Sequence, residues 1–158
     1  MLTGPAPFRF IPGQGAPVEG PAFSPAFKLI ATVIVAACAL GLLQAWRAGS
    51  LGSARTGGLG WFIAGMVLMG WTWIAILRSR TRIDGKGLYQ RWIWDKHMDF
   101  DDLAYGKLIR VRGLDWLIAP RLYVRTLMGK FTVFYGATPA LVAEFERMVV
   151  ELRQFRKL

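Results

Sequence analysis

The chain has one cysteine and one histidine among its 158 residues. A single cysteine forms no disulfide within the chain, and these two side chains are too few for a structural zinc site. Acidic residues are also scarce, since 10 Asp and Glu stand against 20 Lys and Arg, for a net charge of +10. No Ser–His–Asp or Cys–His arrangement stands out. We therefore expect no catalytic residue, no metal site and no cofactor, and hence a protein that is not an enzyme.

Two long apolar runs without charged residues occupy residues 29–46 and 59–77. Each run is about long enough to cross a bilayer as a helix. Neither shows the polar stripe that a buried helix of a soluble protein usually carries. Trp61 begins the second run and Trp71 and Trp73 lie near its end, as interfacial aromatic rings do. The sequence therefore predicts a two-helix transmembrane hairpin over residues 29–77.

Charge predicts the orientation of this hairpin. From Arg78 onward the chain holds 16 of its 20 basic residues and 9 of its 10 acidic ones, a net charge of +7 for that half. Five basic residues follow the second run within 14 positions, whereas the connector between the runs has two. Because basic flanks stay on the cytoplasmic side, we expect both termini in the cytoplasm.

Small residues recur at four-residue spacing in both runs. Ala37 and Gly41 form one pair, and Gly60 and Ala64 form the other. In an antiparallel hairpin both pairs lie toward the connector, where small side chains allow two helices to approach closely. We expect the two helices to contact each other through these four residues.

The first 28 residues read as a mostly disordered leader. Residues 1–26 contain six of the eight prolines and four glycines. A segment of this composition has little with which to build a core. We therefore divide the chain into a leader over residues 1–28, the hairpin over 29–77 and a folded domain over 78–158.

The last half of the chain first shows a period of two, which is typical of half-buried strands. Short turns rich in Gly, Asp and Pro separate the alternating segments. We expect six or seven antiparallel strands in a sandwich or barrel, at about residues 81–83, 88–94, 98–100, 104–112, 116–118, 122–126 and 131–135.

A helical pattern ends the chain. Thr138 suits an N-cap and Pro139 the first helical position. The following apolar stripe has helical spacing and comprises Leu141, Phe145, Met148, Leu152 and Phe155. We expect this amphipathic helix to lie over the open end of the sheet, giving an α+β domain; a coiled-coil dimer is the alternative.

Two local motifs in this half resemble a known family. Residues 81–89, Thr-Arg-Ile-Asp-Gly-Lys-Gly-Leu-Tyr, carry a strand into a glycine turn, and residues 98–103, Met-Asp-Phe-Asp-Asp-Leu, precede a long strand. With the strand count and the last helix, they resemble the bacterial pleckstrin-homology-like (PH-like) domains that follow one or two membrane helices. The resemblance implies a seven-stranded, strongly bent sheet capped by one helix, a binding or assembly role without chemistry, and the bacterial inner (plasma) membrane.

Basic residues and one tyrosine form the candidate binding surface of the domain. They are Arg78, Arg80, Arg82, Lys86, Arg91, Arg110, Arg112, Arg121, Tyr123 and Arg125. Basic residues close to a membrane attract anionic lipid headgroups. We expect the membrane and a protein to be the partners, with anionic headgroups as a further partner, and we do not expect nucleic acid, since a tethered domain seldom binds it.

The leading hypothesis is a non-enzymatic integral membrane protein that presents a basic interaction module at the cytoplasmic face. The alternative is an accessory subunit or assembly factor of a larger membrane complex, which would use the tryptophans and the small-residue faces of the spans.

Overall fold

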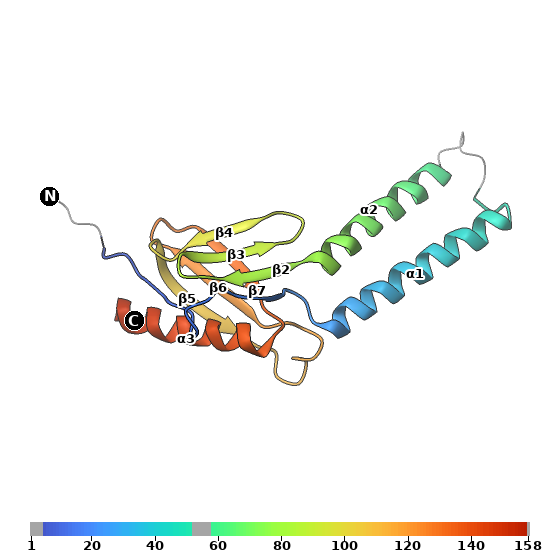
Figure 1. Cartoon of the computed structure of the whole chain (residues 1–158). Coiled ribbons are helices and arrows are strands. Elements are labelled where there is room, and N and C mark those ends of the chain that lie inside the picture. The colour runs from blue at the N-terminus through green and yellow to red at the C-terminus, as the bar shows by residue number, and fades with distance from the viewer. Residues whose placement is uncertain (1–4, 52–57, 158) are drawn as a thin grey trace.

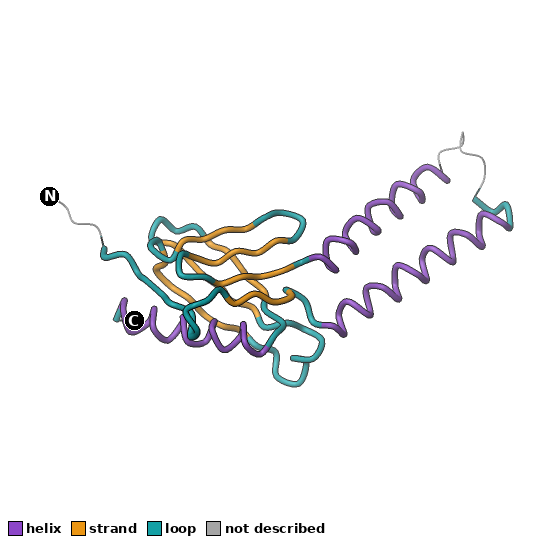
Figure 2. Tube along the Cα trace, in the orientation of Figure 1, coloured by secondary structure: helices purple, strands orange, loops and turns teal. Residues whose placement is uncertain are grey.

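A computed structural model describes residues 5–51 and 58–157 of the chain. Within these ranges the chain forms seven strands and three helices, arranged as a folded domain with a helical arm (Figures 1 and 2). In chain order they are β1 (Val18–Pro21), α1 (Pro25–Arg47), α2 (Gly58–Arg78), β2 (Arg80–Ile83), β3 (Gly87–Arg91), β4 (Lys96–Asp99), β5 (Leu103–Ile109), β6 (Arg121–Thr126), β7 (Phe131–Tyr135) and α3 (Pro139–Arg156).

The strands form two antiparallel sheets, as predicted. One sheet has the order β1-β2-β3-β4 and the other the order β5-β6-β7. Their inner faces and α3 enclose one hydrophobic core, which includes Ile83, Leu88, Leu122 and Phe134, each 0% exposed. The sheets are also joined by hydrogen bonds: the buried Thr81 hydroxyl on β2 donates to the Tyr135 carbonyl on β7 at 2.5 Å.

The helical arm, α1 and α2, is inserted between two strands that are neighbours in one sheet. The chain leaves the domain after β1, runs out along α1, returns along α2 and enters β2 (Figure 1). β1 then pairs antiparallel with β2, with Val18 opposite Ile83 and Pro21 opposite Arg80. Both ends of the arm are therefore fixed to the same sheet, and the domain is built from segments before and after the arm.

The prediction of a disordered leader is wrong for residues 5–28. Phe8 and Phe10 are 2% and 1% exposed in the core, and β1 is a full member of the sheet. Phe8 and Phe10 pack edge-on against Phe100, with ring centroids 6.2 and 5.6 Å apart. Composition missed this because two large aromatic side chains and one strand suffice to anchor a segment that is otherwise rich in Pro and Gly. Residues 1–4 lie outside the described residues.

Two arginines of α3 bind this N-terminal segment to the domain. The Arg156 guanidinium donates to the Ala6 carbonyl at 3.0 Å, and that of Arg147 donates to the Ile11 carbonyl. The Arg147 guanidinium also lies over the Phe10 ring, 4.7 Å from its centroid. The domain therefore comprises residues 5–24 together with residues 79–157, rather than residues 78–158 alone.

Most of the predicted strands are present, with three differences. β3 ends at Arg91 instead of reaching residue 94, β5 ends at Ile109 instead of reaching residue 112, and the segment 116–118 forms a turn rather than a strand. Hydrogen bonds within the segment, such as Leu117 N–H to the Leu114 carbonyl at 3.0 Å, satisfy backbone groups that a strand would pair with a neighbour. The seventh strand of the domain is β1, which comes from the leader.

α3 covers the core as predicted. Its buried side chains include Leu141, Phe145, Met148 and Leu152, and it packs against β5. Phe155 is 44% exposed and lies beside Phe8, with ring centroids 5.5 Å apart. Because the apolar stripe is buried within its own domain, the coiled-coil alternative is wrong.

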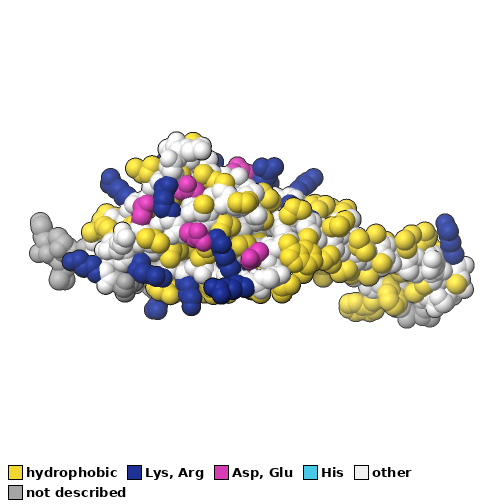
Figure 3. All heavy atoms as spheres, turned by 90° about the horizontal axis from the view of Figure 1, so that it is seen from below, with side chains coloured by type: hydrophobic (Ala, Val, Ile, Leu, Met, Phe, Trp, Pro, Cys, Tyr) yellow, Lys and Arg dark blue, Asp and Glu magenta, His cyan; other side chains and the backbone are white. Residues whose placement is uncertain are grey.

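The two predicted spans lie within α1 and α2, which are 23 and 21 residues long. Both helices are long and apolar enough to cross a membrane, with mean hydropathies of 2.3 and 1.7 over their most apolar windows. None of the residues in these windows is buried, so neither helix is the core helix of a soluble domain. The space-filling view shows the apolar side chains along this arm (Figure 3).

The helices of the arm do not meet through the four small residues that the sequence predicted. Ala37, Gly41, Gly60 and Ala64 are all exposed, and no atom lies within 4 Å of a Cβ built on Gly41 or Gly60. The contacts lie instead near the domain, where the Trp73 indole N–H donates to the Thr32 hydroxyl at 2.9 Å. The spacing of small residues does not by itself determine which faces of the two helices meet. Here the hydrogen bond between Trp73 and Thr32 fixes the faces that are in contact.

Two buried serines connect the arm to the domain. Ser24 caps α1 by accepting a hydrogen bond from the Phe27 N–H at 3.2 Å, and its hydroxyl donates to the Leu117 carbonyl at 2.7 Å. Ser79 follows α2; its hydroxyl donates to the Ile76 carbonyl of that helix at 2.7 Å, and its own carbonyl accepts from the Ala22 N–H after β1 at 3.4 Å. The two serines are 3% and 1% exposed. Since both junctions are buried and hydrogen-bonded, the arm leaves the domain in a fixed direction.

The role of the N-terminal segment can be tested at Phe10. We expect Phe10→Ala to lower the free energy of unfolding by about 3–5 kcal/mol, the usual cost of removing a buried aromatic side chain. Thermal unfolding of the detergent-solubilised full chain, followed by near-ultraviolet circular dichroism, measures the effect. Ile11→Ala is the matched control, because Ile11 is 71% exposed and should change stability by less than about 0.5 kcal/mol. Equal stability of both variants would contradict the fold of this segment.

Candidate functional site

Charged side chains gather on the outer face of the β1–β4 sheet. Strand alternation creates this face, because Thr81 and Ile83 of β2 point into the core while Arg80 and Arg82 point outward. In β3 the same rule buries Leu88 and Gln90 and turns Tyr89 and Arg91 outward.

The strand register brings these outward residues together across the sheet. Arg80 lies directly opposite Arg91, and Arg82 lies between Glu19 of β1 and Tyr89 of β3. Two like charges directly opposite each other destabilise a sheet pairing. The Arg80–Arg91 pair therefore costs the fold stability rather than supplying it.

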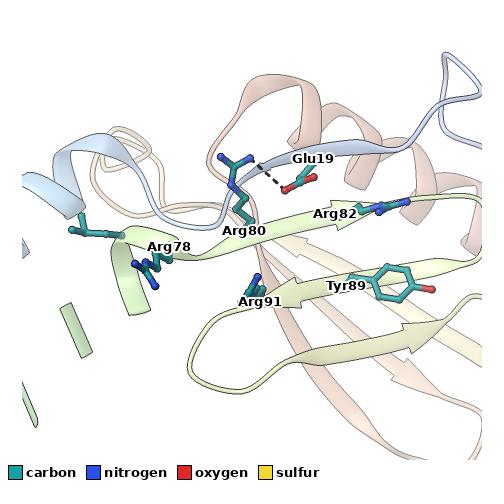
Figure 4. A pocket seen from close by; sticks show the side chains of 7 residues that line it. Glu19, Arg78, Arg80, Arg82, Tyr89 and Arg91 are labelled. Atoms are coloured by element: carbon teal, nitrogen blue, oxygen red, sulfur yellow. Dashed lines mark hydrogen bonds and ion pairs between the residues drawn. The ribbon is translucent and has the colours of Figure 1, made fainter. Parts of the chain in front are cut away.

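These residues line a groove of ≈ 620 Å³ that reaches from the sheet to the end of α2. We call it the arginine groove; it is formed by Glu19, Leu77, Arg78, Arg80, Arg82, Tyr89 and Arg91. Figure 4 shows Arg78, Arg80 and Arg91 near one another where α2 joins β2, with Arg82 and Tyr89 farther along the strands. Four guanidinium groups face one carboxylate here, so the groove is positively charged.

The acidic side chains around the groove neutralise only part of this charge. Glu19 pairs with Arg80 at 3.4 Å, and Asp84 pairs with Arg82 at 3.5 Å. Arg78 and Arg91 form no ion pair within residues 5–51 and 58–157. The end of the groove nearest the arm thus has two guanidinium groups available for an external anion.

Lys28 removes an unfavourable charge at the same end of the groove. The C-terminus of a helix carries partial negative charge on its last carbonyl groups. The Lys28 ammonium of α1 donates to the Leu77 carbonyl in the last turn of α2 at 3.1 Å. The carbonyl dipole of α2 is therefore compensated and does not oppose an anion beside Arg78.

Tyr89 provides a hydroxyl at the far part of the groove. Its ring stacks on His97 with centroids 4.5 Å apart, and His97 Nε2 lies 2.9 Å from the Asp99 carboxylate. Burial raises the pKa of Tyr89, and the nearby Asp84 and Asp99 carboxylates raise it further. The hydroxyl is therefore protonated at neutral pH and can donate a hydrogen bond to an anion.

A second, apolar pocket adjoins the arginine groove. It has a volume of ≈ 180 Å³ and shares Arg78 and Arg91 with the groove. Its other lining residues come from the last turns of α2 and from the loop after β3: Trp71, Ile74, Ala75, Trp92 and Ile93. A positively charged groove and an apolar pocket therefore meet at the two unpaired arginines.

Two loops beside the base of the arm expose large aromatic side chains. The loop between β3 and β4 presents Trp94, which is 73% exposed, and the loop between β5 and β6 presents Trp116, which is 62% exposed. The second loop is held at the arm by the Ser24–Leu117 hydrogen bond. Exposed tryptophans next to apolar helices are typical of a membrane–water interface.

A cluster of aromatic rings supports this end of the domain. The Phe23 ring packs against Phe27, Trp92 and Tyr135 with centroid distances of 5.2–5.5 Å. The Lys96 ammonium lies 5.9 Å from the ring centroids of both Trp92 and Tyr135, and burial lowers the pKa of Lys96. The cluster fixes the loop after β3 relative to the first turn of α1.

The ten candidate residues do not form one surface. Arg78, Arg80, Arg82 and Arg91 line the arginine groove, while Lys86 lies at the β2–β3 turn in a neighbouring hollow that shares Arg82 and Tyr89 with the groove.

The other candidates lie on the second sheet and in its loops. Arg121, Tyr123 and Arg125 occupy the outer face of β6, which we call the basic aromatic face, and Phe131 packs against Tyr123 at 5.4 Å. Arg110 forms an ion pair with Glu146 of α3, and Arg112 is exposed in the β5–β6 loop.

Sequence reasoning missed several residues of the site. The Pro and Gly content of residues 1–28 predicts disorder and therefore excludes Glu19 from the site; the aromatic pair Phe8 and Phe10 is the signal in the sequence that this segment packs on a core. The residues Phe-Ser-Pro at 23–25 also indicate where α1 begins, because Ser24 is a favourable N-cap and Pro25 suits the first helical position. Trp92 and Ile93 could not be assigned to the end of α2, because that contact depends on the tertiary fold.

No cluster of three or more His, Cys, Asp or Glu side chains that could hold a metal ion occurs in the described part of the chain. The site's chemistry is that of fixed positive charge beside an apolar surface. Comparison with known proteins found no matching family model, no matching curated protein and no matching solved structure.

The energetic cost of the groove can be measured at Arg91. Arg91→Glu replaces a like-charge pair with an opposite-charge pair across β2 and β3, so we expect the free energy of unfolding to rise by about 0.5–1 kcal/mol. Arg125→Glu is the matched control, because Tyr105 and Phe131 lie opposite Arg125 and carry no charge. Thermal unfolding of the full chain gives both values. Destabilisation by Arg91→Glu alone would mean that Arg91 supports the fold.

Proposed function

We propose that this protein is a non-enzymatic, integral protein of the bacterial inner (plasma) membrane that presents a PH-like interaction module at the cytoplasmic face. The observation that carries the proposal is the insertion of an exposed apolar arm between β1 and β2. Because both ends of the arm join the same sheet, the domain is held at a fixed distance from the bilayer. Tethering also raises its effective concentration for partners in the same membrane.

The strand order supports a PH-like module. The resemblance of residues 81–89 and 98–103 implies a seven-stranded bent sheet capped by one helix, and seven strands in two antiparallel sheets with a C-terminal helix over the core are compatible with it. In this arrangement β1 precedes the membrane helices and the other six strands follow them.

Charge at the base of the arm supports the cytoplasmic orientation. Lys28, Arg78, Arg80 and Arg91 lie at the domain end of the two helices. Positive charge at one end of a membrane helix favours that end on the cytoplasmic side. Trp94 and Trp116 beside the arm fit a domain whose loops rest at the headgroups of that leaflet.

The basic aromatic face is the surface we assign to a protein partner. Arg121, Tyr123 and Arg125 alternate along β6 and point away from the core, with Phe131 of β7 57% exposed beside them. Aromatic and arginine side chains are enriched in protein interfaces. Their positive charge favours an acidic partner surface.

The alternative is an accessory subunit or assembly factor of a larger membrane complex. One observation favours it: Ala37, Gly41, Gly60 and Ala64 are not used between α1 and α2 and remain exposed on the arm. Small residues on a lipid-facing surface allow close packing of a further span.

Membrane topology tests the first part of the proposal. A fusion of green fluorescent protein after the last residue should fluoresce, and a fusion of alkaline phosphatase at the same position should be inactive, because the C-terminus lies in the cytoplasm. The protein should stay in the membrane pellet after carbonate washing. Active phosphatase or release into the supernatant would contradict the proposal.

Photocrosslinking in living cells distinguishes the two candidate functions. Benzoylphenylalanine at Tyr123 should capture one defined protein with a cytoplasmic domain, while the same group at exposed Gln154 on α3 should not. The same group at Ala64 should capture another membrane protein if the accessory-subunit function holds. Capture at Ala64 without capture at Tyr123 would favour the alternative, and capture at neither position would contradict both.

A further inference from the structure

We propose that the arginine groove and the adjoining apolar pocket form one binding site for an anionic phospholipid of the leaflet next to the domain. The phosphate lies against Arg78 and Arg91, with Arg80 beside it, and the start of an acyl chain lies in the pocket. The inference rests on the proposed function in one respect, which is that the arm spans a membrane. The lipid is a ligand for a surface to which the proposed function assigns no partner.

The first argument is the shape and position of the two cavities. The groove has a volume of ≈ 620 Å³, which is within the size range of ligand sites. The adjoining pocket has a volume of ≈ 180 Å³, and its lining is mainly apolar. They share Arg78 and Arg91, so a polar and an apolar subsite adjoin at two cationic residues. A ligand that fills both subsites must carry an anionic group next to an apolar chain.

The second argument is continuity with the membrane span. The pocket is lined on one side by Trp71, Ile74 and Ala75 of α2, and the helix ends at Arg78. Trp71 is 65% exposed and Ile74 41% exposed. A lipid whose acyl chain lies along this face of α2 presents its phosphate at the level of Arg78 without leaving the bilayer. A soluble anion without an apolar chain would occupy the groove and leave the pocket empty.

The third argument is charge. Arg78 and Arg91 have no acidic partner in the described part of the chain, and Lys28 compensates the last carbonyl groups of α2. Arg80 and Arg91 lie directly opposite each other, an arrangement that a bound anion relieves. Guanidinium groups bind phosphate oxygens through paired hydrogen bonds, which suits a phosphodiester.

Native mass spectrometry of the detergent-solubilised full chain tests the site. We expect one molecule of phosphatidylglycerol to be retained at least tenfold more tightly than phosphatidylcholine, whose choline group cancels the phosphate charge. Glycerol phosphate at equal concentration should not displace it, because the headgroup alone leaves the pocket empty. Equal retention of both lipids, or displacement by glycerol phosphate, would overturn the assignment.

Variants with equal charge loss provide the control. Arg78→Gln with Arg91→Gln should weaken phosphatidylglycerol retention about 25-fold, since each basic residue near a lipid surface is worth about fivefold. Lys107→Gln with Arg153→Gln removes the same charge from exposed positions outside both cavities and should leave retention unchanged. Circular dichroism confirms that both variants fold. If both pairs weaken retention equally, the lipid is held by the net charge of the protein and not by a specific site, and the proposal is wrong.

These experiments distinguish a failure of the lipid site from a failure of the proposed function. If Arg78→Gln with Arg91→Gln leaves lipid retention unchanged but removes the protein captured from Tyr123, the groove binds that protein and the lipid assignment is wrong. The topology experiment would still support the membrane-anchored module. If the arm fails to remain in the membrane, the proposed function itself falls, and the lipid site falls with it.

Discussion

The pairing of β1 with β2 is the contact on which the rest of the structure depends. These strands are neighbours in one sheet, yet the whole helical arm lies between them in the chain. An insertion of this kind is tolerated when its two ends lie close together, and the antiparallel pair supplies that proximity. The Ser24 hydroxyl then donates to the Leu117 carbonyl and the Ser79 carbonyl accepts from the Ala22 N–H, and these two bonds close the junction. The direction of the arm is therefore a property of the folded domain rather than of a linker.

This arrangement also explains why positive charge collects where the arm begins. The outer face of β2 and β3 carries Arg80, Arg82 and Arg91, and α2 ends at Arg78 immediately before β2. Among the residues that the structure describes, Glu19 of β1 is the one acidic residue lining the groove. Two arginines opposite each other are costly for the sheet, and local costs of this kind are expected at functional sites. The adjoining apolar pocket exists because the loop after β3 reaches back to the end of α2.

Periodicity predicted most of the regular elements that follow the arm. Alternation predicted β2 to β7, although it also predicted a strand at residues 116–118, which form a turn. The stripe from Leu141 to Leu152 predicted α3 and its buried face. Composition failed for the N-terminal segment, because average Pro and Gly content hides the contribution of Phe8 and Phe10. The spacing of small residues failed for the arm, because polar contacts at Thr32 and Lys28 decide which faces meet. The arginines were identified from the sequence, but their division between two surfaces follows from strand register and sheet packing.

Hydrogen–deuterium exchange of residues 8–22 in the full chain, reconstituted in lipid nanodiscs, tests the central claim most directly. If β1 is a strand of the domain, the amides of residues 18–20 that face β2 exchange as slowly as those of β2 and β3. If these residues exchange at the rate of an unstructured peptide while β2 and β3 remain protected, the arm is attached to the domain at one end alone, and the pairing of β1 with β2 does not hold the arm.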